Sequence, residues 1–191
     1  TTGTFSADIT VNGHRVGRGA GNVAGNVAVG DDSLESNTTG GNNTAVGNDA
    51  LRSNTTGSEN TAIGENSLDA NTTASNNTAI GSQALNANTT GTKNTGVGAF
   101  SLYTASTADN NTAIGYDALK LNTTGTQNTA MGVQSLDACT TGTRNTGLGA
   151  FSLSALTTGN YNVAVGKGCL EATTTSDYNT ALGYEALALN S

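Results

Sequence analysis

Large aliphatic and polar residues recur along most of the chain with one fixed spacing. Numbered from its first asparagine, the repeating unit is Asn-Thr-Ala-[Val/Ile/Leu/Met]-Gly-x-x-[Ala/Ser]-Leu-x-x-Asn-Thr-Thr-Gly-x-x, with small variations. Its copies follow one another every 17 residues without insertion or deletion. A constant period gives every copy the same environment, which predicts a solenoid. The ten copies begin at Asn26, Asn43, Asn60, Asn77, Asn94, Asn111, Asn128, Asn145, Asn162 and Asn179.

The unit itself predicts β-structure. Seventeen residues are too few for two packed helices, and the content of Gly, Asn and Thr disfavours helix. We expect a short strand at positions 1–4, a second short strand around the leucine at position 9, and a turn at Asn-Thr-Thr-Gly in which Gly or Asn adopts positive φ. The fold class is therefore all-β: a parallel β-solenoid or β-roll of ten coils, each paired with the next at ~4.8 Å.

Alternation along a strand predicts which side chains point inward. We expect positions 2 and 4 to face the interior together with the leucine at position 9, and positions 1, 3 and 5 to face outward. Stacked asparagines at position 1 then form an amide ladder. In copies 5 and 8, Gly96 and Gly147 stand at position 3 while Phe100 and Phe151 stand at position 7. We expect a ring, including one from a neighbouring chain, to fill the space beside each glycine; independent drift is the alternative.

Residues 1–25 differ from the array at 26–191. Apolar residues alternate in FSADITV (residues 5–11), which is strand spacing, and Asn12-Gly13 is a hairpin turn signal followed by the basic arm HRVGRG. We interpret this segment as a cap or junction, because an uncovered ladder invites aggregation. The chain begins TTGTF and stops inside a repeat, so we expect a fragment of a longer protein.

The composition and net charge of the chain argue against some classes of binding partner. Aromatic residues make up 4% and charged residues 11% of the chain, and the net charge is −7. This balance argues against nucleic acid and anionic membranes as partners, and no apolar run has transmembrane length. Each copy has only two large aliphatic residues to offset the conformational entropy of ordering 17 residues. We therefore expect the chain to associate with other copies of itself.

The residues needed for catalysis or a metal centre are not found in a recognisable pattern. His14 is the single histidine, so the chain has no Cys/His cluster with metal-binding spacing, and a Ser-His-Asp triad would have to use His14. We expect His14 to lie in a surface turn. Cys139 and Cys169 lie two copies apart, beyond disulfide reach. For Arg15 and Arg18, a role in binding nucleic acid or another anion is the alternative to a structural role in the cap. We predict no enzyme, no catalytic residue, no cofactor and no metal.

Two further sets of polar residues receive a structural interpretation. Carboxylates at positions 6 and 7 have the chemistry to bind a hard cation, but solvated turns explain them better: Asp31, Asp32, Asp49, Glu65, Asp117 and Glu185. Five Asn-Thr-Thr words match the glycosylation sequon, but the repeat itself generates the match: Asn37, Asn54, Asn71, Asn88 and Asn122.

The repeat words resemble those of a known class of proteins. NTAIGYDALKLNTTGTQNTAMG (residues 111–132) is similar to the repeats of phage and large-virus tail-fibre or fibre-like proteins, and DITVNGHRVGRGAGN (residues 8–22) to the segment before such arrays. The Ala-[Val/Ile]-Gly word also resembles the head repeats of trimeric autotransporter adhesins, whose unit is shorter. The resemblance covers 26–191 and implies a left-handed parallel β-roll with three chains around one axis, located on the virion surface.

The resulting hypothesis is a structural and adhesive segment of a homotrimeric virion fibre that attaches to a host surface receptor, with a glycan among the receptor classes. We expect contact from variable positions and single out no binding residue; nucleic acid and membrane insertion are not expected. An ice-binding solenoid stays open, because threonines at positions 2, 13 and 14 form rows, although position 2 is expected to face inward. A bacterial surface adhesin also stays open. The variable positions hold Tyr103, Tyr116, Tyr161, Tyr178 and Tyr184.

Overall fold

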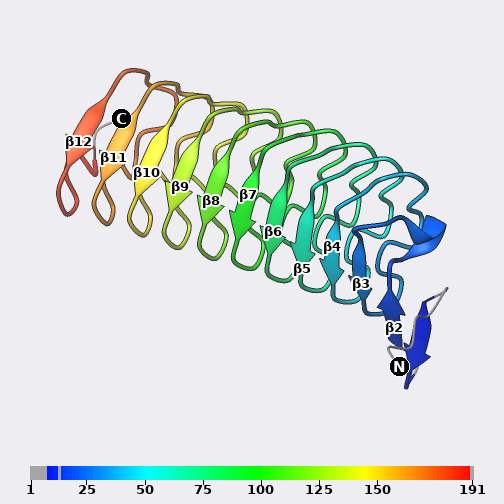
Figure 1. Ribbon diagram of the computed structural model, residues 1–191. Helices are drawn as coiled ribbons and strands as arrows, with labels where there is room; N and C mark the ends of the chain where they lie inside the picture. Colours follow the sequence, from blue (N-terminus) through cyan, green and yellow to red (C-terminus); the bar gives the residue numbers. More distant parts are fainter. Residues whose placement is uncertain (1–7, 13, 190–191) are drawn as a thin grey trace.

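The structure is a computed structural model that describes residues 8–12 and 14–189, and it forms one elongated rod (Figure 1). The predicted parallel β-solenoid is confirmed. Each complete 17-residue copy forms one coil, and the described residues make about nine turns. We number the coils from coil 1 at Asn26 to coil 10, the shortened copy that begins at Asn179. The parallel strands follow one another in sequence order along the rod: β3 (Val27–Val29), β4 (Thr44–Val46), β5 (Thr61–Ile63), β6 (Thr78–Ile80), β7 (Thr95–Val97), β8 (Thr112–Ile114), β9 (Thr129–Met131), β10 (Thr146–Leu148), β11 (Val163–Val165) and β12 (Thr180–Leu182).

Every coil pairs with the next in perfect register. In β5 and β6, Thr61 lies opposite Thr78 and Ile63 opposite Ile80. Hydrogen bonds between coils continue outside the sheet: the Leu51 N–H donates to the carbonyl of Ser67 at 3.0 Å. The backbone groups of neighbouring coils are thus joined on more than one side of the rod, which satisfies polar groups that would otherwise be buried without partners.

The direction of the strand side chains is the reverse of our expectation. The position-3 residues Ala62 and Ala79 are completely buried, whereas the position-4 residues Ile63 and Ile80 are 39% and 38% exposed. The prediction that positions 2 and 4 face inward was therefore wrong. Asn60 at position 1 is also buried, and because alternate residues share a face, the asparagine places position 3 inside and positions 2 and 4 outside.

The asparagines at position 1 form the predicted amide ladder, but inside the rod rather than outside it. Asn60 is representative: its Oδ1 accepts the backbone N–H of Asn77 at 3.0 Å, and its Nδ2 donates to Asn43 Oδ1 at 3.2 Å and to the carbonyl of Ala74 at 2.9 Å. Backbone-to-side-chain bonds of this kind run from coil 1, where Asn26 Oδ1 accepts at 2.8 Å, to coil 10. Each buried amide therefore ties one coil to the next.

The leucine at position 9 does not lie in a second strand. Positions 6–11 form consecutive turns, and the position-9 residues Leu51 and Leu68 adopt φ of 51° and 50° while remaining completely buried. Position 7 also has positive φ, at 54° in Asn66, so the chain reverses within a few residues. The positive φ expected in the Asn-Thr-Thr-Gly turn lies at position 17 instead, for example 63° at Asn76.

The glycine at position 5 begins this reversal. Gly64 has φ of 135°, and a Cβ added to it would lie 2.5 Å from the carbonyl oxygen of Gly81 in the next coil. Both the backbone conformation and the close approach exclude larger residues. This explains why all ten copies have glycine at position 5.

Six residues of each of coils 1–8 are buried inside the rod, at positions 1, 3, 8, 9, 12 and 15. In coil 3 the leucine at position 9 is the one large apolar side chain of this set, and the other five residues are polar or alanine. In coil 3 the six are at most 2% exposed: Asn60, Ala62, Ser67, Leu68, Asn71 and Ala74.

The glycines of coils 5 and 8 do not make room for phenylalanine rings. Position 3 faces the interior, where a Cβ added to Gly96 would lie 2.9 Å from the hydroxyl of Ser101. Phe100 and Phe151 lie at position 7, which is half-buried and outside the coil. Our expectation that a ring fills the space beside each glycine was wrong.

A β-hairpin precedes the first coil. β1 (Ile9–Val11) and β2 (His14–Gly17) are antiparallel, and β2 pairs antiparallel with β3 through Val16 and Val29. Both carboxylate oxygens of Asp8 accept backbone N–H groups at the turn into the first coil, from Arg18 at 2.6 Å and Gly19 at 2.9 Å. A short 3-10 helix, η1 (Ala20–Asn22), follows. The expected start of the first strand at residues 5–7, and Gly13 of the turn, lie outside the described residues.

A second amide ladder, at position 12, was not predicted. Side chains bond from Asn54 to Asn37 at 2.9 Å, from Asn71 to Asn54 at 2.8 Å and from Asn88 to Asn71 at 3.0 Å. Ala105 interrupts the ladder in coil 5, and the buried Oδ1 of Asn88 is left without a hydrogen-bond partner. The Oδ1 of Asn122 is left unpaired in the same way, because Cys139 follows it in coil 7.

Replacing Ala105 by asparagine should therefore stabilise the rod. The new amide supplies a donor to Asn88 Oδ1, and the pair Asn71 and Ala74 in coil 3 shows that asparagine at position 12 fits with alanine at position 15. Pairing one buried acceptor should raise the free energy of unfolding by about 1–2 kcal/mol. Chemical denaturation monitored by circular dichroism measures this change.

The matched control is Ala87→Asn, which adds the same side chain at half-buried position 11 of coil 4. It should change stability by less than about 0.5 kcal/mol. An A105N protein no more stable than the wild type would show that the unpaired amide oxygen carries no cost.

Candidate functional surfaces

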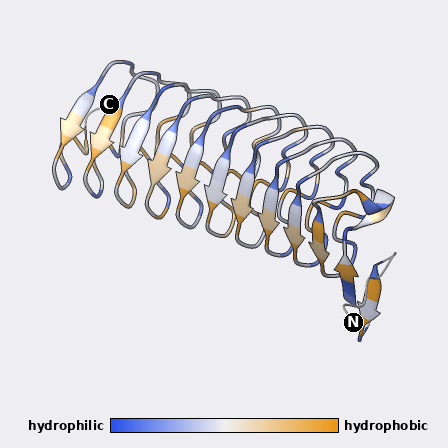
Figure 2. Ribbon diagram, viewed as in Figure 1, coloured by the Kyte–Doolittle hydropathy of each residue, from blue (hydrophilic) through white to orange (hydrophobic). Residues whose placement is uncertain are grey.

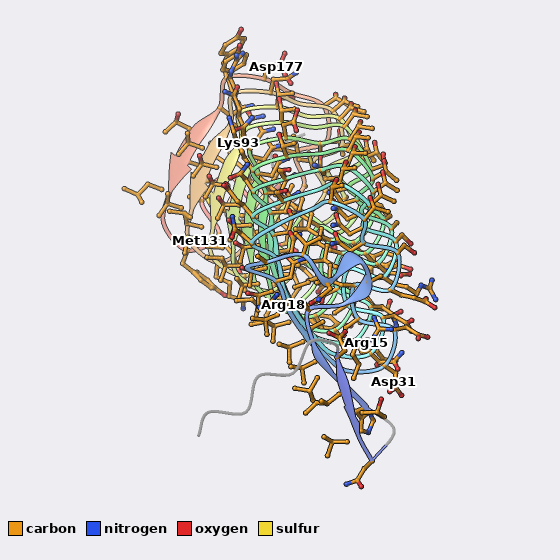
Figure 3. The ribbon with its side chains drawn as sticks, turned by 45° about the vertical axis from the view of Figure 1, so that its right-hand side comes forward. Arg15, Arg18, Asp31, Lys93, Met131 and Asp177 are labelled. Atoms are coloured by element: carbon orange, nitrogen blue, oxygen red, sulfur yellow. The ribbon has the colours of Figure 1, made fainter. Side chains whose placement is uncertain are left out.

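The outer face of the sheet is free of charged residues over all ten coils. We call the surface formed by positions 2 and 4 of β3–β12 the outer sheet face. Met131 in β9 is 42% exposed and projects away from the rod (Figure 3). In Figure 2 several strands carry the hydrophobic colour from one coil to the next. The position-4 residues form an aliphatic row: Val29, Val46, Ile63, Ile80, Val97, Ile114, Met131, Leu148, Val165 and Leu182.

Threonines lie beside the aliphatic row. Eight of the ten position-2 residues are threonine, and they point outward with position 4. The hydroxyls of the position-13 row instead bond to the backbone of the next coil, as Thr55 Oγ1 donates to the carbonyl of Thr72 at 3.0 Å. Position 14, for example Thr73, is exposed. The outer sheet face is therefore a regular array of hydroxyl and methyl groups, with coils ~4.8 Å apart.

Aromatic rings gather along one edge of coils 5 and 6. Phe100 makes edge-to-face contacts with Tyr103 and Tyr116, with ring centroids 5.8 and 6.0 Å apart. The ammonium of Lys120 lies 5.4 Å from the centre of the Phe100 ring and 3.2 Å from Asp117 Oδ2. We call these five residues the aromatic corner. Both tyrosines were expected at variable positions of the repeat, but their contact with Phe100 was not predicted.

A second aromatic arrangement lies at position 17 of coils 7–9. The rings of Tyr161 and Tyr178 stack 5.0 Å apart with an interplanar angle of 6°. The guanidinium of Arg144 lies 5.2 Å from the centre of the Tyr161 ring, and Arg144 also donates to the Tyr161 hydroxyl and to Gln127 Oε1. The stacked faces cover one another, so this row has a clear role in joining coils.

Two carboxylates, one in coil 6 and one in coil 7, interact electrostatically with Lys120. Lys120 bridges to Asp117, and Asp137 occupies position 10 one coil further on. Burial raises the pKa of Asp137 above its usual value of 3.8, with a smaller contribution from the charge of Asp117. Coils 2 and 3 repeat the pattern, since Arg52 donates to Asp49 and Asp69 at 3.3 and 3.2 Å.

At the N-terminal end, the residues considered as a site contact neighbouring side chains and backbone of the hairpin and the first coil. His14 Nδ1 lies 3.2 Å from Asp31 Oδ1. Arg15 donates to the carbonyl of Ser33 at 3.1 Å and lies 3.7 Å from Asp8, at the end of the rod shown in Figure 3. Among residues 8–12 and 14–189, no cluster of three or more His, Cys, Asp or Glu side chains is arranged to hold a metal ion.

Both cysteines are buried and form no disulfide. Burial raises the pKa of the Cys139 thiol to about 11, and the pKa of Cys169 is raised for the same reason. The Cys139 thiol is therefore protonated at neutral pH, and it donates weakly to the carbonyl of Gly142 at 3.8 Å. The two residues act as small interior side chains.

The asparagines of the five sequon matches are the position-12 residues of the second ladder or its continuation. All are at most 2% exposed: Asn37, Asn54, Asn71, Asn88 and Asn122. Their conservation from copy to copy within the chain therefore has a structural explanation in the folded rod.

Comparison with known proteins gave no match among protein-family models, curated proteins or solved structures. In the described part of the chain, no helix has the length and hydrophobicity to span a membrane.

Replacing Asp137 by asparagine should change how stability depends on pH. The pKa of Asp137 is higher in the folded state than in the unfolded state. Asp137 therefore makes its full contribution to the free energy of unfolding below the unfolded-state pKa, and this contribution is lost as pH rises through the folded-state pKa. D137N lacks this titration. Thermal unfolding from pH 3 to pH 7 should therefore show the wild type losing stability relative to D137N as pH increases, and parallel curves would contradict the buried carboxylate.

Proposed function

We propose that this chain is a segment of a homotrimeric virion fibre with a mechanical and an adhesive role. The observation that carries the proposal is the uncharged outer sheet face with its exposed aliphatic row. Apolar rows of this length on soluble proteins mark interaction surfaces, and the centres of protein interfaces are depleted of charged residues. Three rods that pack through this face would bury the row around a common axis. The number three and a left-handed coil rest on the resemblance to fibre and adhesin repeats.

The remaining surfaces suit adhesion. Interior positions repeat from coil to coil, whereas positions 6, 7, 10 and 17 vary and present aromatic and charged side chains to the outside. A fixed scaffold with variable outer positions allows receptor contact to change without disturbing the core. We propose a receptor on a host surface, which places the rod on the outside of a virion; a bacterial surface adhesin would use the same architecture.

Native mass spectrometry tests the assembly directly. The expected mass is three times the 18.9 kDa of the chain. The double variant Ile63→Lys/Ile80→Lys places two ammonium groups in the aliphatic row and should give monomers, because unpaired charges are costly to bury at an interface. Thr73→Lys/Thr90→Lys adds the same charges at exposed position 14 of the same coils and should remain trimeric. A monomeric wild type would refute the trimer.

Ice binding is a second candidate, because the structure corrects the orientation of position 2. The threonines at this position face outward beside the aliphatic row, so the outer sheet face presents evenly spaced hydroxyl and methyl groups. Such an array can order water into a regular layer and hold it against a crystal surface. The two candidates use the same face, which is buried in a trimer and must be free to contact ice.

Thermal hysteresis separates the candidates. The fibre proposal predicts a trimer that does not depress the freezing point below the melting point. The ice-binding candidate predicts a monomer with measurable hysteresis that Ile63→Lys/Ile80→Lys abolishes and Thr73→Lys/Thr90→Lys preserves.

A further inference from the structure

The aromatic corner combines the two kinds of group that a sugar requires. A sugar ring has a face of C–H groups, which packs on aromatic rings, and hydroxyls, which need charged or polar partners. Tyr116 is 49% exposed, and Phe100 and Tyr103 are half-buried beside it. Lys120 and Asp117 lie at the same edge, where the lysine contacts both the Phe100 ring and the carboxylate.

Asp117 provides an independent indication of a polar ligand. Its side chain is 7% exposed, and its Oδ2 is paired with Lys120 at 3.2 Å. Its Oδ1 is buried and has no hydrogen-bond partner in the described structure. A buried carboxylate oxygen without a donor is costly, so a ligand hydroxyl that donates to it would gain affinity. An apolar ligand would offer no such donor.

The corner is a local feature, not a product of the repeat. Phe151 occupies the same position in coil 8, within the same sequence Gly-Ala-Phe-Ser-Leu. At the positions of Tyr103 and Tyr116, however, coils 8 and 9 have Ser154 and Lys167. A role for the rings in coil folding would apply equally to both phenylalanines, so the additional rings beside Phe100 call for another explanation.

We propose that the aromatic corner, formed by Phe100, Tyr103, Tyr116, Lys120 and Asp117, is a binding site for a neutral sugar ring of a surface glycan. The exposed rings cover the C–H face of the sugar. The ammonium of Lys120 donates to its hydroxyl oxygens, and one of its hydroxyls donates to Asp117 Oδ1. This inference deepens the adhesive part of the proposed function and rests on it.

Saturation-transfer NMR on the whole chain tests the site. The probes are the methyl glycosides of glucose, galactose, mannose and N-acetylglucosamine. At least one should bind with a Kd on the order of 1 mM, as expected for a single sugar on an open surface. Phe100→Asn should weaken binding about tenfold or more, because it removes the central ring of the site. Asp117→Asn should also weaken binding, because a carboxylate has two acceptor oxygens whereas an amide has one acceptor oxygen and one donor nitrogen.

Phe151→Asn is the matched control, and it should leave the Kd within about twofold. Asparagine suits both sites because Asn66 occupies position 7 of coil 3 with φ of 54°. Circular dichroism should show all variants folded. Absence of saturation transfer from every probe, or equal loss in both phenylalanine variants, would overturn the sugar site. Because neither phenylalanine lies on the outer sheet face, native mass spectrometry of the same samples reports on the fibre proposal separately.

Discussion

The structure depends on the amide of the position-1 asparagine. Its oxygen accepts the backbone N–H of the next coil and its nitrogen donates both to the preceding amide and to a carbonyl across the coil, as in Asn60. A buried amide costs stability unless its groups are paired, and here identical side chains on identical coils pair one another. The same interaction fixes the direction of every strand, because an inward asparagine brings alanine inward and turns positions 2 and 4 outward.

The solenoid and its amide ladder could be predicted from the sequence, whereas the orientation of the strands was predicted wrongly. The solenoid followed from the constant period, and the amide ladder followed from the asparagine in every copy. The strand orientation was missed because Ile63 and Ile80 are hydrophobic and were expected inside. A better signal was size: position 3 is always alanine or glycine, as a narrow interior requires, while position 4 varies among Val, Ile, Leu and Met.

Other features could not be predicted from sequence for reasons of local conformation. Leucine rarely adopts positive φ, so the left-handed turn at Leu51 and its equivalents has no recognisable sequence pattern. It occurs because the inward leucine fills the centre of a short coil. The aromatic corner likewise required the turn geometry, since Phe100 and Tyr116 come together only when position 7 of one coil lies beside position 6 of the next.

Polar residues hold this rod together from within, and aliphatic residues lie on its outer sheet face. This inversion explains why the chain combines a regular architecture with an exposed apolar row, and it is the reason that we propose the outer sheet face as the surface for assembly or for contact with ice. In the proposed fibre, the variable edges, where the aromatic corner lies, are the surfaces left free for a receptor. Under the proposed function, structure, assembly and recognition are therefore assigned to different positions of one 17-residue unit: the interior asparagine, the outer aliphatic row and the variable edge.

The most direct test of the account is the free energy of unfolding of Asn111→Ala. In the wild type, Asn111 Oδ1 accepts the backbone N–H of Asn128 at 2.9 Å inside the rod. Its loss leaves that group buried without a partner, so the variant should lose about 2–4 kcal/mol, whereas Thr124→Ala at exposed position 14 should lose less than about 0.5 kcal/mol. Equal stability of the two variants would contradict the claim that buried amides hold the coils together.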